Sequence, residues 1–259
     1  MYTDREMDSV ESRPRPSAPV LRGDLSVLVD QYRQRYLATS PWPYLVLDGL
    51  VDPALLAAAE SEELKPALDL HVRRTTRMVK AQSPMPSGPA AGEILHALCS
   101  SGFVAFLEDL TGISGLIADP THYWAGLHVF PPGSFQALHR DFRVHPVTGL
   151  FHRVNVIVYL NGDWKDEYGG NLELWKYDMS SHHQVAPRAG STVIFENTSA
   201  TLHGVAEVFR CPPGGARLSL ASNYYTASPG ADDWKETRFR RPKRPQDPWY
   251  MGFKLRRSS

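Results

Sequence analysis

The sequence is poor in cysteine, in long apolar runs and in any excess of charge of one sign. Only Cys99 and Cys211 are present among 259 residues, so neither a disulfide framework nor a paired-cysteine zinc site is available. No window approaches the roughly 18 apolar residues that a membrane-spanning helix needs. Lys and Arg together number 28, as do Asp and Glu, and this balance gives no reason to expect a nucleic-acid or membrane partner. We therefore expect a cytoplasmic globular protein.

The first part of the chain is expected to be a short leader followed by helices. Residues 1–19 contain no apolar stretch of signal-peptide length, and their prolines and charges predict disorder. Residues 20–118 are predicted to be an α-rich support region, in which Asp52 and Pro53 have the residue types of a helix start. Residues 71–92 are predicted to be either a lid or a plain connection.

After about residue 119 the sequence changes to short β-rich runs separated by glycine, proline and asparagine. The runs HYWAGLHVF, HRVNVIVYL, NLELW, STVIF and ARLSLASNYY predict an antiparallel sandwich or barrel over residues 119–227. Residues 228–259 form a basic, proline-containing extension. We expect residues 20–259 to form one compact domain.

A candidate metal site begins at His139-Arg140-Asp141. Side chains at i and i+2 of an extended strand share a face, so both ligands can reach one ion. With ten histidines and 28 acidic residues, chance alone supplies roughly one such His-x-acid match. The context that follows makes it specific: His203 is the histidine of STVIFENTSATLHG, and Arg217 lies fourteen residues further on, with Ser219 two residues after it. Two imidazoles and one carboxylate on one face leave open octahedral positions, as non-haem Fe(II) oxygenases require.

Five ordered segments carry a resemblance to a known family. They are GLHVFPPGSFQALHRDF, RVNVIVYLNGDW, YGGNLELW, APRAGSTVIFENTSATLHGVAEV and ARLSLASNYYT. From about residue 43 to residue 226 the chain resembles the prolyl-4-hydroxylase-like branch of the Fe(II)/2-oxoglutarate-dependent oxygenases. The resemblance implies a mainly β fold with flanking α-helices: a double-stranded β-helix (jelly-roll, cupin-like) core with the N-terminal helices packed on its major sheet.

The same resemblance implies roles for individual residues. His139, Asp141 and His203 would be the catalytic metal ligands, and Arg217 would form a bidentate salt bridge with the distal carboxylate of 2-oxoglutarate. Ser219 and Tyr159 would add hydroxyl groups to the same carboxylate. Five further residues are candidates for the substrate pocket: Asn155, Arg153, His128, Phe130 and Trp175. Some relatives have a tyrosine on the strand before the first ligand, where this chain has His128 and Phe130.

The expected function is that of an oxygenase. The cofactors implied are Fe(II), 2-oxoglutarate as co-substrate and dioxygen, with ascorbate as a candidate stimulant. The expected reaction hydroxylates an unactivated C–H bond of an amino-acid, peptidyl or other small-molecule substrate and yields succinate and carbon dioxide. The alternative is a non-catalytic, cupin-like binding protein that retains the barrel and the metal site. The sequence does not distinguish among substrates or oligomeric states, because fold and co-substrate do not determine them.

Overall fold

The computed structural model describes residues 19–230 and 239–240. Nearly all of the predicted leader and most of the predicted C-terminal extension lie outside the described residues. Within the described part, thirteen strands, four α-helices and one short 3-10 helix, Asp166–Tyr168, follow one another along the chain. The strands are β1 Tyr44–Asp48, β2 Arg73–Arg74, β3 Met78–Ser83, β4 Ile117–Ala118, β5 Gly126–Phe130, β6 Phe135–His139, β7 Phe151–Tyr159, β8 Leu172–Lys176, β9 His182–Val185, β10 Ser191–Glu196, β11 Thr201–Val205, β12 Arg217–Thr226 and β13 Phe239–Arg240.

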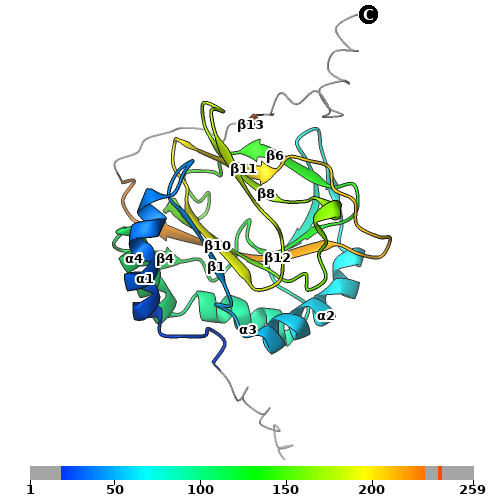
Figure 1. Ribbon diagram of the computed structural model, residues 1–259, viewed down its shortest axis with the longest axis horizontal. Coiled ribbons are helices and arrows are strands. Elements are labelled where there is room, and N and C mark those ends of the chain that lie inside the picture. Colours follow the sequence, from blue (N-terminus) through cyan, green and yellow to red (C-terminus); the bar gives the residue numbers. More distant parts are fainter. Residues whose placement is uncertain (1–18, 231–238, 241–259) are drawn as a thin grey trace, which may run out of the picture.

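The strands form two antiparallel layers that meet at β3. The major layer has the order β1-β10-β7-β12-β5-β3, and the minor layer has the order β6-β11-β8-β9. β3 pairs with β5 through Ala81 and Val129 and with β6 through Met78 and Gln136, so it joins the two layers into a nearly closed barrel. This arrangement confirms the predicted double-stranded β-helix. Figure 1 shows β6, β8 and β11 on the side of the barrel opposite β1, β10 and β12.

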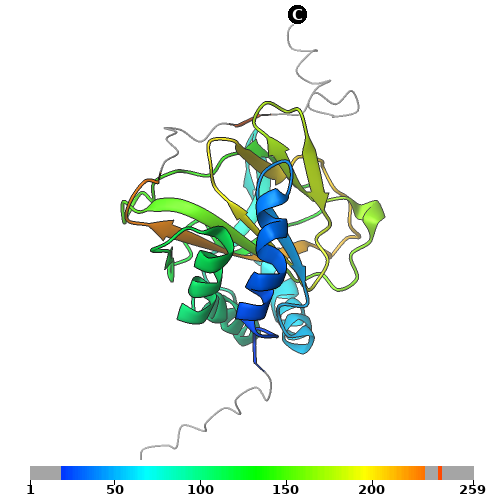
Figure 2. The same cartoon turned by 60° about the vertical axis from the view of Figure 1, so that its left-hand side comes forward.

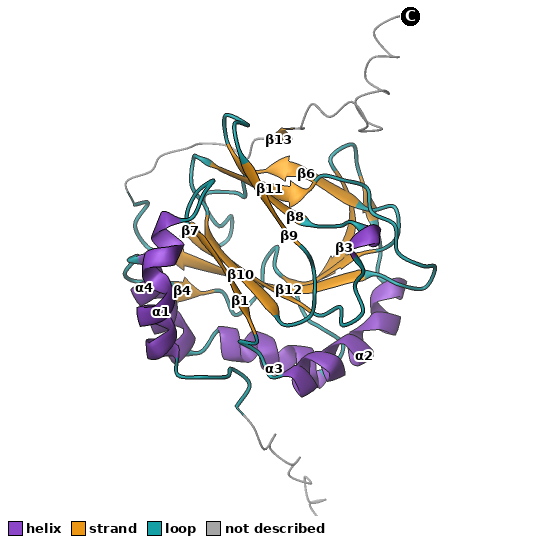
Figure 3. Ribbon diagram, in the orientation of Figure 1, coloured by secondary structure: helices purple, strands orange, loops and turns teal. Residues whose placement is uncertain are grey.

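Four helices cover the outer face of the major layer. They are α1 Leu25–Ala38, α2 Pro53–Asp69, α3 Pro89–Leu98 and α4 Ser101–Thr111. Figures 2 and 3 show them gathered on one side of the strands. Side chains on the outer face of the sheet, including Val154, Val156 and Val158 of β7 and Leu218 and Leu220 of β12, join the helices in one buried cluster. The helices therefore support the sheet that carries part of the site, as predicted.

Local sequence explains where the helices begin. Asp52 accepts hydrogen bonds from the backbone N–H groups of Ala54 and Leu55 at 3.0 and 3.1 Å, and Pro53 occupies the first turn. Proline suits this position because its missing N–H would have no intrahelical partner there. Ser100 caps α4 in the same way, through a 3.3 Å bond from the N–H of Phe103. The boundary between α3 and α4 thus coincides with this cap.

The segment 71–92 differs from the expected loop. It contains β2 and β3, and β3 is a wall of the barrel. The sequence MVKAQS of β3 lacks the apolar alternation of a half-buried strand, because Lys80 is buried at a position where an apolar residue is the usual choice. The middle of this segment is therefore part of the barrel, and not a lid or a plain connection.

Among the described residues, no single helix is long and apolar enough to span a membrane; α3 and α4 pass that test only when taken together across a bend of 51°.

Candidate functional site

Three potential metal ligands converge at the edge of the minor layer. β6 ends at His139, Asp141 follows two residues later, and His203 of β11 lies directly opposite His139 in the strand register. Asp141 Oδ1 lies 3.4 Å from His139 Nε2, and Asp141 Oδ2 lies 3.5 Å from His203 Nε2. One ligand atom from each residue falls within 4.8 Å of the other two. This donor set fits a divalent first-row metal such as Fe(II).

A hydrogen bond from Nδ1 of His139 to the backbone orients the ring so that Nε2 faces the other two potential ligands. Its Nδ1 lies 2.9 Å from the backbone carbonyl oxygen of Ala137, which accepts the ring N–H. Metal-binding histidines commonly use such a bond to fix the ring and its tautomer. The Nε2 atom then carries a lone pair, and the Gln136 side-chain amide lies 3.1 Å from it.

Burial and charge keep the other two ligands in the protonation states that bind metal. Burial alone would raise the pKa of the Asp141 carboxyl, but His203 and His139 lower it overall to well below its ordinary value. Burial lowers the pKa of His203 to about 3, against the attraction of the Asp141 carboxylate. At neutral pH Asp141 is therefore ionised, and His203 is neutral with a lone pair available.

Arg217, the first residue of β12, is a buried cation with only 2% of its surface exposed. Its Nε donates to the carbonyl of Gly170 at 2.8 Å, and its Nη2 donates to the hydroxyl of Tyr159 at 3.2 Å. No carboxylate among the described residues pairs with it. Burying a charge without a counter-charge is costly, so such a guanidinium is prepared for an anion from outside the protein.

The ligand cluster and Arg217 line the same cavity, which has a volume of about 270 Å³. β7 and β12 contribute alternate residues to it, since their other face packs on the helices. Eight of the residues proposed from the sequence line this cavity: His139, Asp141, His203, Arg217, Ser219, Asn155, His128 and Phe130. Tyr159 stands behind Arg217, which it holds through the hydrogen bond between their side chains.

Arg153 and Trp175, both predicted to belong to the pocket, do not line this cavity. Arg153 shares a face of β7 with Asn155, but it lies beyond the cavity, where its Nη1 is 3.5 Å from Thr226 Oγ1. Trp175 lies on the opposite face of β8 from Leu172. Its Nε1 donates to Glu173 at 2.7 Å, and its ring stacks on another side chain. Residue spacing gives the face of a strand but not how far a cavity extends along it.

The cavity also contains residues that the sequence did not reveal. Lys80 and Met78 enter it from β3, and Asn223 enters it from β12, where it lies opposite Asn155. Asn223 could have been found by extending the two-residue period from Arg217 and Ser219. No comparable signal marks Lys80, because a lone lysine in a short segment is ordinarily on the surface.

His128 is held as a neutral imidazole in the cavity wall. It lies on β5 opposite Ser219, and its Nε2 has no hydrogen-bond partner among the described residues. Burial, together with the positive charge of Lys80, lowers its pKa well below the ordinary value. The position thus offers a polar nitrogen, rather than a charge, to whatever the cavity holds.

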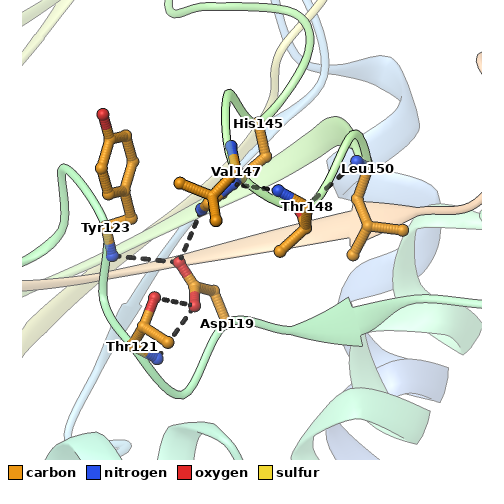
Figure 4. Close-up of polar contacts among 7 residues, drawn as sticks. All are labelled: Asp119, Thr121, Tyr123, His145, Val147, Thr148 and Leu150. Carbon is orange, nitrogen blue, oxygen red and sulfur yellow. Dashed lines mark hydrogen bonds and ion pairs between the residues drawn. The ribbon is translucent and has the colours of Figure 1, made fainter.

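A polar network organises the turn that precedes β5 (Figure 4). Asp119 accepts hydrogen bonds from the backbone of Thr121 at 2.9 Å and of Tyr123 at 3.0 Å. Its second oxygen lies 3.6 Å from Nε2 of His145, whose Nδ1 accepts from two N–H groups of its own turn. The proton of neutral His145 therefore belongs on Nε2, facing Asp119. This pair ties together the turns before β5 and β7, and Trp124, the residue after Tyr123 in the first of these turns, lines the cavity.

Comparison with known proteins gives a family match over the part of the barrel from β5 to β12 and fold matches over most of the chain. The model of the 2OG-Fe(II) oxygenase superfamily matches residues 125–225. No curated protein matches the chain. A solved prolyl-4-hydroxylase from Pseudomonas putida is 24% identical, with a TM-score of 0.56, over 79% of this chain and 100% of its own.

Two more distant structures share the fold. A prolyl hydroxylase from Trichoplax adhaerens, solved with a hypoxia-inducible-factor peptide fragment, is 15% identical with a TM-score of 0.54, over 78% of this chain and 90% of its own. The α-ketoglutarate-dependent epimerase SnoN from nogalamycin biosynthesis is 14% identical with a TM-score of 0.52, over 86% of this chain and 95% of its own. The fold therefore accommodates more than one reaction.

The family match covers the strands that carry His139, His203 and Arg217, and the similar structures cover a larger share of the chain, 79% for the first of them. The predicted resemblance to the prolyl-4-hydroxylase-like 2OG-Fe(II) oxygenases is thereby confirmed over residues 125–225, which include β5 to β11 and nearly all of β12.

Proposed function

We propose that this protein is an Fe(II)- and 2-oxoglutarate-dependent dioxygenase that hydroxylates an unactivated C–H bond of an amino-acid, peptidyl or other small-molecule substrate. One observation carries the proposal: a three-residue ligand cluster and a buried arginine without a carboxylate partner among the described residues line a single cavity. The ligand types suit Fe(II), and the guanidinium suits a carboxylate.

Each residue has a defined task in this proposal. His139, Asp141 and His203 hold the metal on one side and leave its remaining positions open. Arg217 binds the distal carboxylate of 2-oxoglutarate, and Ser219, which lines the same cavity two residues further along β12, donates its hydroxyl to that carboxylate. With 2-oxoglutarate and dioxygen, bound iron supplies the oxidation that yields succinate, carbon dioxide and the hydroxylated product.

The surroundings of Arg217 support this task. Gly170 and Tyr159 accept two of its N–H groups and fix the plane of the guanidinium, which leaves the others for a ligand. The Phe130 ring lies 5.1 Å from the Arg217 Cζ and covers one side of the guanidinium. Apolar cover of this kind excludes water, and the resulting low dielectric strengthens an ion pair. A fixed guanidinium would hold 2-oxoglutarate in one position, which the reaction at the metal requires.

The first test measures succinate formation from 2-oxoglutarate by the full chain, loaded with Fe(II) without oxygen and then exposed to oxygen. We expect slow turnover by the wild type, none by His139→Ala, and a Kd for 2-oxoglutarate raised about tenfold or more in Arg217→Met, as loss of a charge-assisted contact predicts. His96→Ala, an exposed change in α3, is the matched control and should behave as the wild type.

Two outcomes would contradict the proposal in different ways. Tight iron and 2-oxoglutarate binding without succinate, over a screen of amino acids and peptides, would favour the non-catalytic binding protein. Succinate formation with an inverted rather than a hydroxylated product would indicate epimerisation, a reaction named for one protein of this fold. Mass spectrometry of the product distinguishes hydroxylation from epimerisation, because hydroxylation adds one oxygen atom to the substrate and epimerisation adds none.

A further inference from the structure

Lys80 is a second buried cation in the wall of the barrel. The register of β3 with β5 pairs Ala81 with Val129, so Lys80 lies next to Phe130 on the neighbouring strand. Arg217 of β12 lies opposite Phe130 on the other side. The Phe130 ring centre is 5.8 Å from the Lys80 Nζ and 5.1 Å from the Arg217 Cζ. A phenyl ring thus separates two cations that line one cavity.

The ammonium group forms no ion pair among the described residues, and the Asp141 carboxylate of the same cavity attracts it without contacting it. Lys80 is 7% exposed, and within the described residues its Nζ makes no hydrogen bond or ion pair. Burial lowers its pKa to about 8, which still leaves it mostly protonated at neutral pH. Lysines are rarely buried unless they are paired. A ligand that brings a negative charge would remove this cost.

The proposed co-substrate already has partners for both of its carboxylates. Arg217 would hold the distal one, and His139, Asp141 and His203 would hold a metal to which the other carboxylate and the keto group can bind. The two positive charges of Fe(II) would cancel the two negative charges of 2-oxoglutarate, and the charges of Asp141 and Arg217 would cancel each other. A histidine that ligates a metal is neutral and adds no charge. Lys80 would then add an excess positive charge inside the assembled site, beside that of Arg73 at its rim. One further anionic group, from another molecule, would balance it.

The position of Lys80 fits a group that enters from outside. A second cavity, of about 300 Å³, lies beside the first, and four residues line both: Arg73, Met78, Lys80 and Trp124. Lys80 therefore lies where the two spaces meet. Arg73, an exposed cation, lies 5.7 Å from the Trp124 ring, and this tryptophan is 44% exposed. Positive charge continues from the interior of the first cavity to the rim.

We propose that Lys80 binds an anionic group, specifically a carboxylate, of the substrate that is oxidised, and that Arg73 attracts the same group at the rim. This inference rests on the proposed function and specifies its substrate class: acids, including amino acids and peptides with a free or side-chain carboxylate. Lys80 acts by binding and orientation. An ammonium with three rotatable donors can hold a carboxylate without imposing one geometry.

The test is calorimetric and does not depend on turnover. The full chain is saturated with Mn(II) and 2-oxoglutarate and titrated with two matched pairs of probes that differ in charge: phenylacetate with phenylacetamide, and N-acetyl-L-prolinate with N-acetyl-L-prolinamide. In the wild type we expect each acid to bind at least about tenfold more tightly than its amide, the usual effect of one charge-assisted contact. Lys80→Met and Lys80→Gln should abolish the preference without changing the Kd for 2-oxoglutarate.

Lys65→Met, the same substitution at an exposed position of α2, is the matched control and should retain the preference. Equal binding of acid and amide by the wild type, or no saturable binding of either acid, would overturn the inference. A rise in the Kd for 2-oxoglutarate in both Lys80 variants, like that expected for Arg217→Met, would assign Lys80 to the co-substrate instead. If the wild type binds neither Mn(II) nor 2-oxoglutarate, the proposed function itself fails, and that result is separate from the comparison of acid with amide.

Discussion

At the scale of single residues, Lys80 and Arg217 place positive charge in the barrel wall without acidic partners among the described residues. A buried charge without a partner costs folding free energy, and a binding site accepts this cost because the ligand recovers it. Arg217 distributes its charge over a planar group with two fixed acceptors, Gly170 and Tyr159. The Lys80 ammonium has no hydrogen-bond acceptor among the described residues. The folding free energy lost by burying its charge should therefore be easier to measure than that lost by burying Arg217.

Replacing Lys80 should therefore stabilise the ligand-free protein. Its pKa is about 8 in the folded chain and 10.5 in its ordinary state, a difference worth up to about 3 kcal/mol. The folded state binds fewer protons than the unfolded state between these values, so the penalty is complete below pH 8 and fades as the pH rises towards 10.5. Asp141 opposes the shift, while Arg217 and Arg73 add to it.

Urea unfolding in the presence of a chelator measures this effect. We expect Lys80→Met to exceed the wild type in unfolding free energy at pH 7 and to exceed it by less at pH 10. Lys65→Met should remain within about 0.5 kcal/mol of the wild type at both values, as exposed substitutions usually do. A Lys80→Met protein that is less stable than the wild type at pH 7 would show that the ammonium is satisfied in the fold.

The sequence predicted the positions of those cavity residues that are related by short spacings. His139 and Asp141 are two residues apart, and Arg217 and Ser219 share one face of a strand, so backbone geometry alone brings each pair together. Arg153 also follows this rule, yet it lies outside the cavity, because the rule does not indicate where the cavity ends. Lys80 could not be identified, since its burial depends on two strands that are more than 40 residues away in sequence.

At the scale of elements, β12 connects the helical layer to the site. Its inward residues carry Arg217 and Asn223 into the cavity, and its outward residues pack on the helices. Tyr224 donates a 2.7 Å hydrogen bond to the carbonyl of Leu98, the last residue of α3. The carbonyl groups of a last helical turn have no intrahelical partner, so this hydroxyl satisfies a group that would otherwise be buried and unpaired.

Removing that hydroxyl should weaken the contact between helix and sheet. We expect Tyr224→Phe to lower the free energy of unfolding by about 1–2 kcal/mol, because it leaves the Leu98 carbonyl unsatisfied. Tyr32→Phe, the same change on α1 where no hydrogen bond of the hydroxyl is found among the described residues, should have little effect. Urea midpoints at constant slope provide the comparison. Equal stability of Tyr224→Phe and the wild type would mean that water replaces the bond at no cost.

Elements with strong local signals were predicted more completely than those without. The caps at Asp52 and Ser100 and the valine-rich β7 are visible in the sequence, because each depends on neighbouring residues. β3 lies in the segment predicted to be a lid or a plain connection, and β9 is not among the predicted β-rich runs. Both strands are short and mix charged or polar residues with apolar ones. Such strands form because partners in the barrel offer hydrogen bonds, and the sequence of the strand alone does not show those partners.

At the scale of the whole molecule, the proposed ligands join the two layers of the barrel. The metal ligands come from the minor layer or the chain just after it, and Arg217 comes from the major layer. A metal with 2-oxoglutarate coordinated to it would span the space between the layers. Binding of this kind stabilises the folded state alone, because the unfolded chain holds no such site.

The Tm of thermal unfolding should therefore rise in two separable steps, one for the metal and one for 2-oxoglutarate. With a metal at 100 times its Kd, the folded state gains about 2.7 kcal/mol, which for a chain of this size corresponds to roughly 5–10 °C in Tm. Adding 2-oxoglutarate to the Mn(II)-loaded wild type should raise Tm again. His139→Ala should lose both increments, since the co-substrate chelates the metal, whereas Arg217→Met should retain the first and lose most of the second. If 2-oxoglutarate stabilised Arg217→Met as much as the wild type, another cation would hold its distal carboxylate, and Lys80, on the far side of Phe130, would be the residue to replace next.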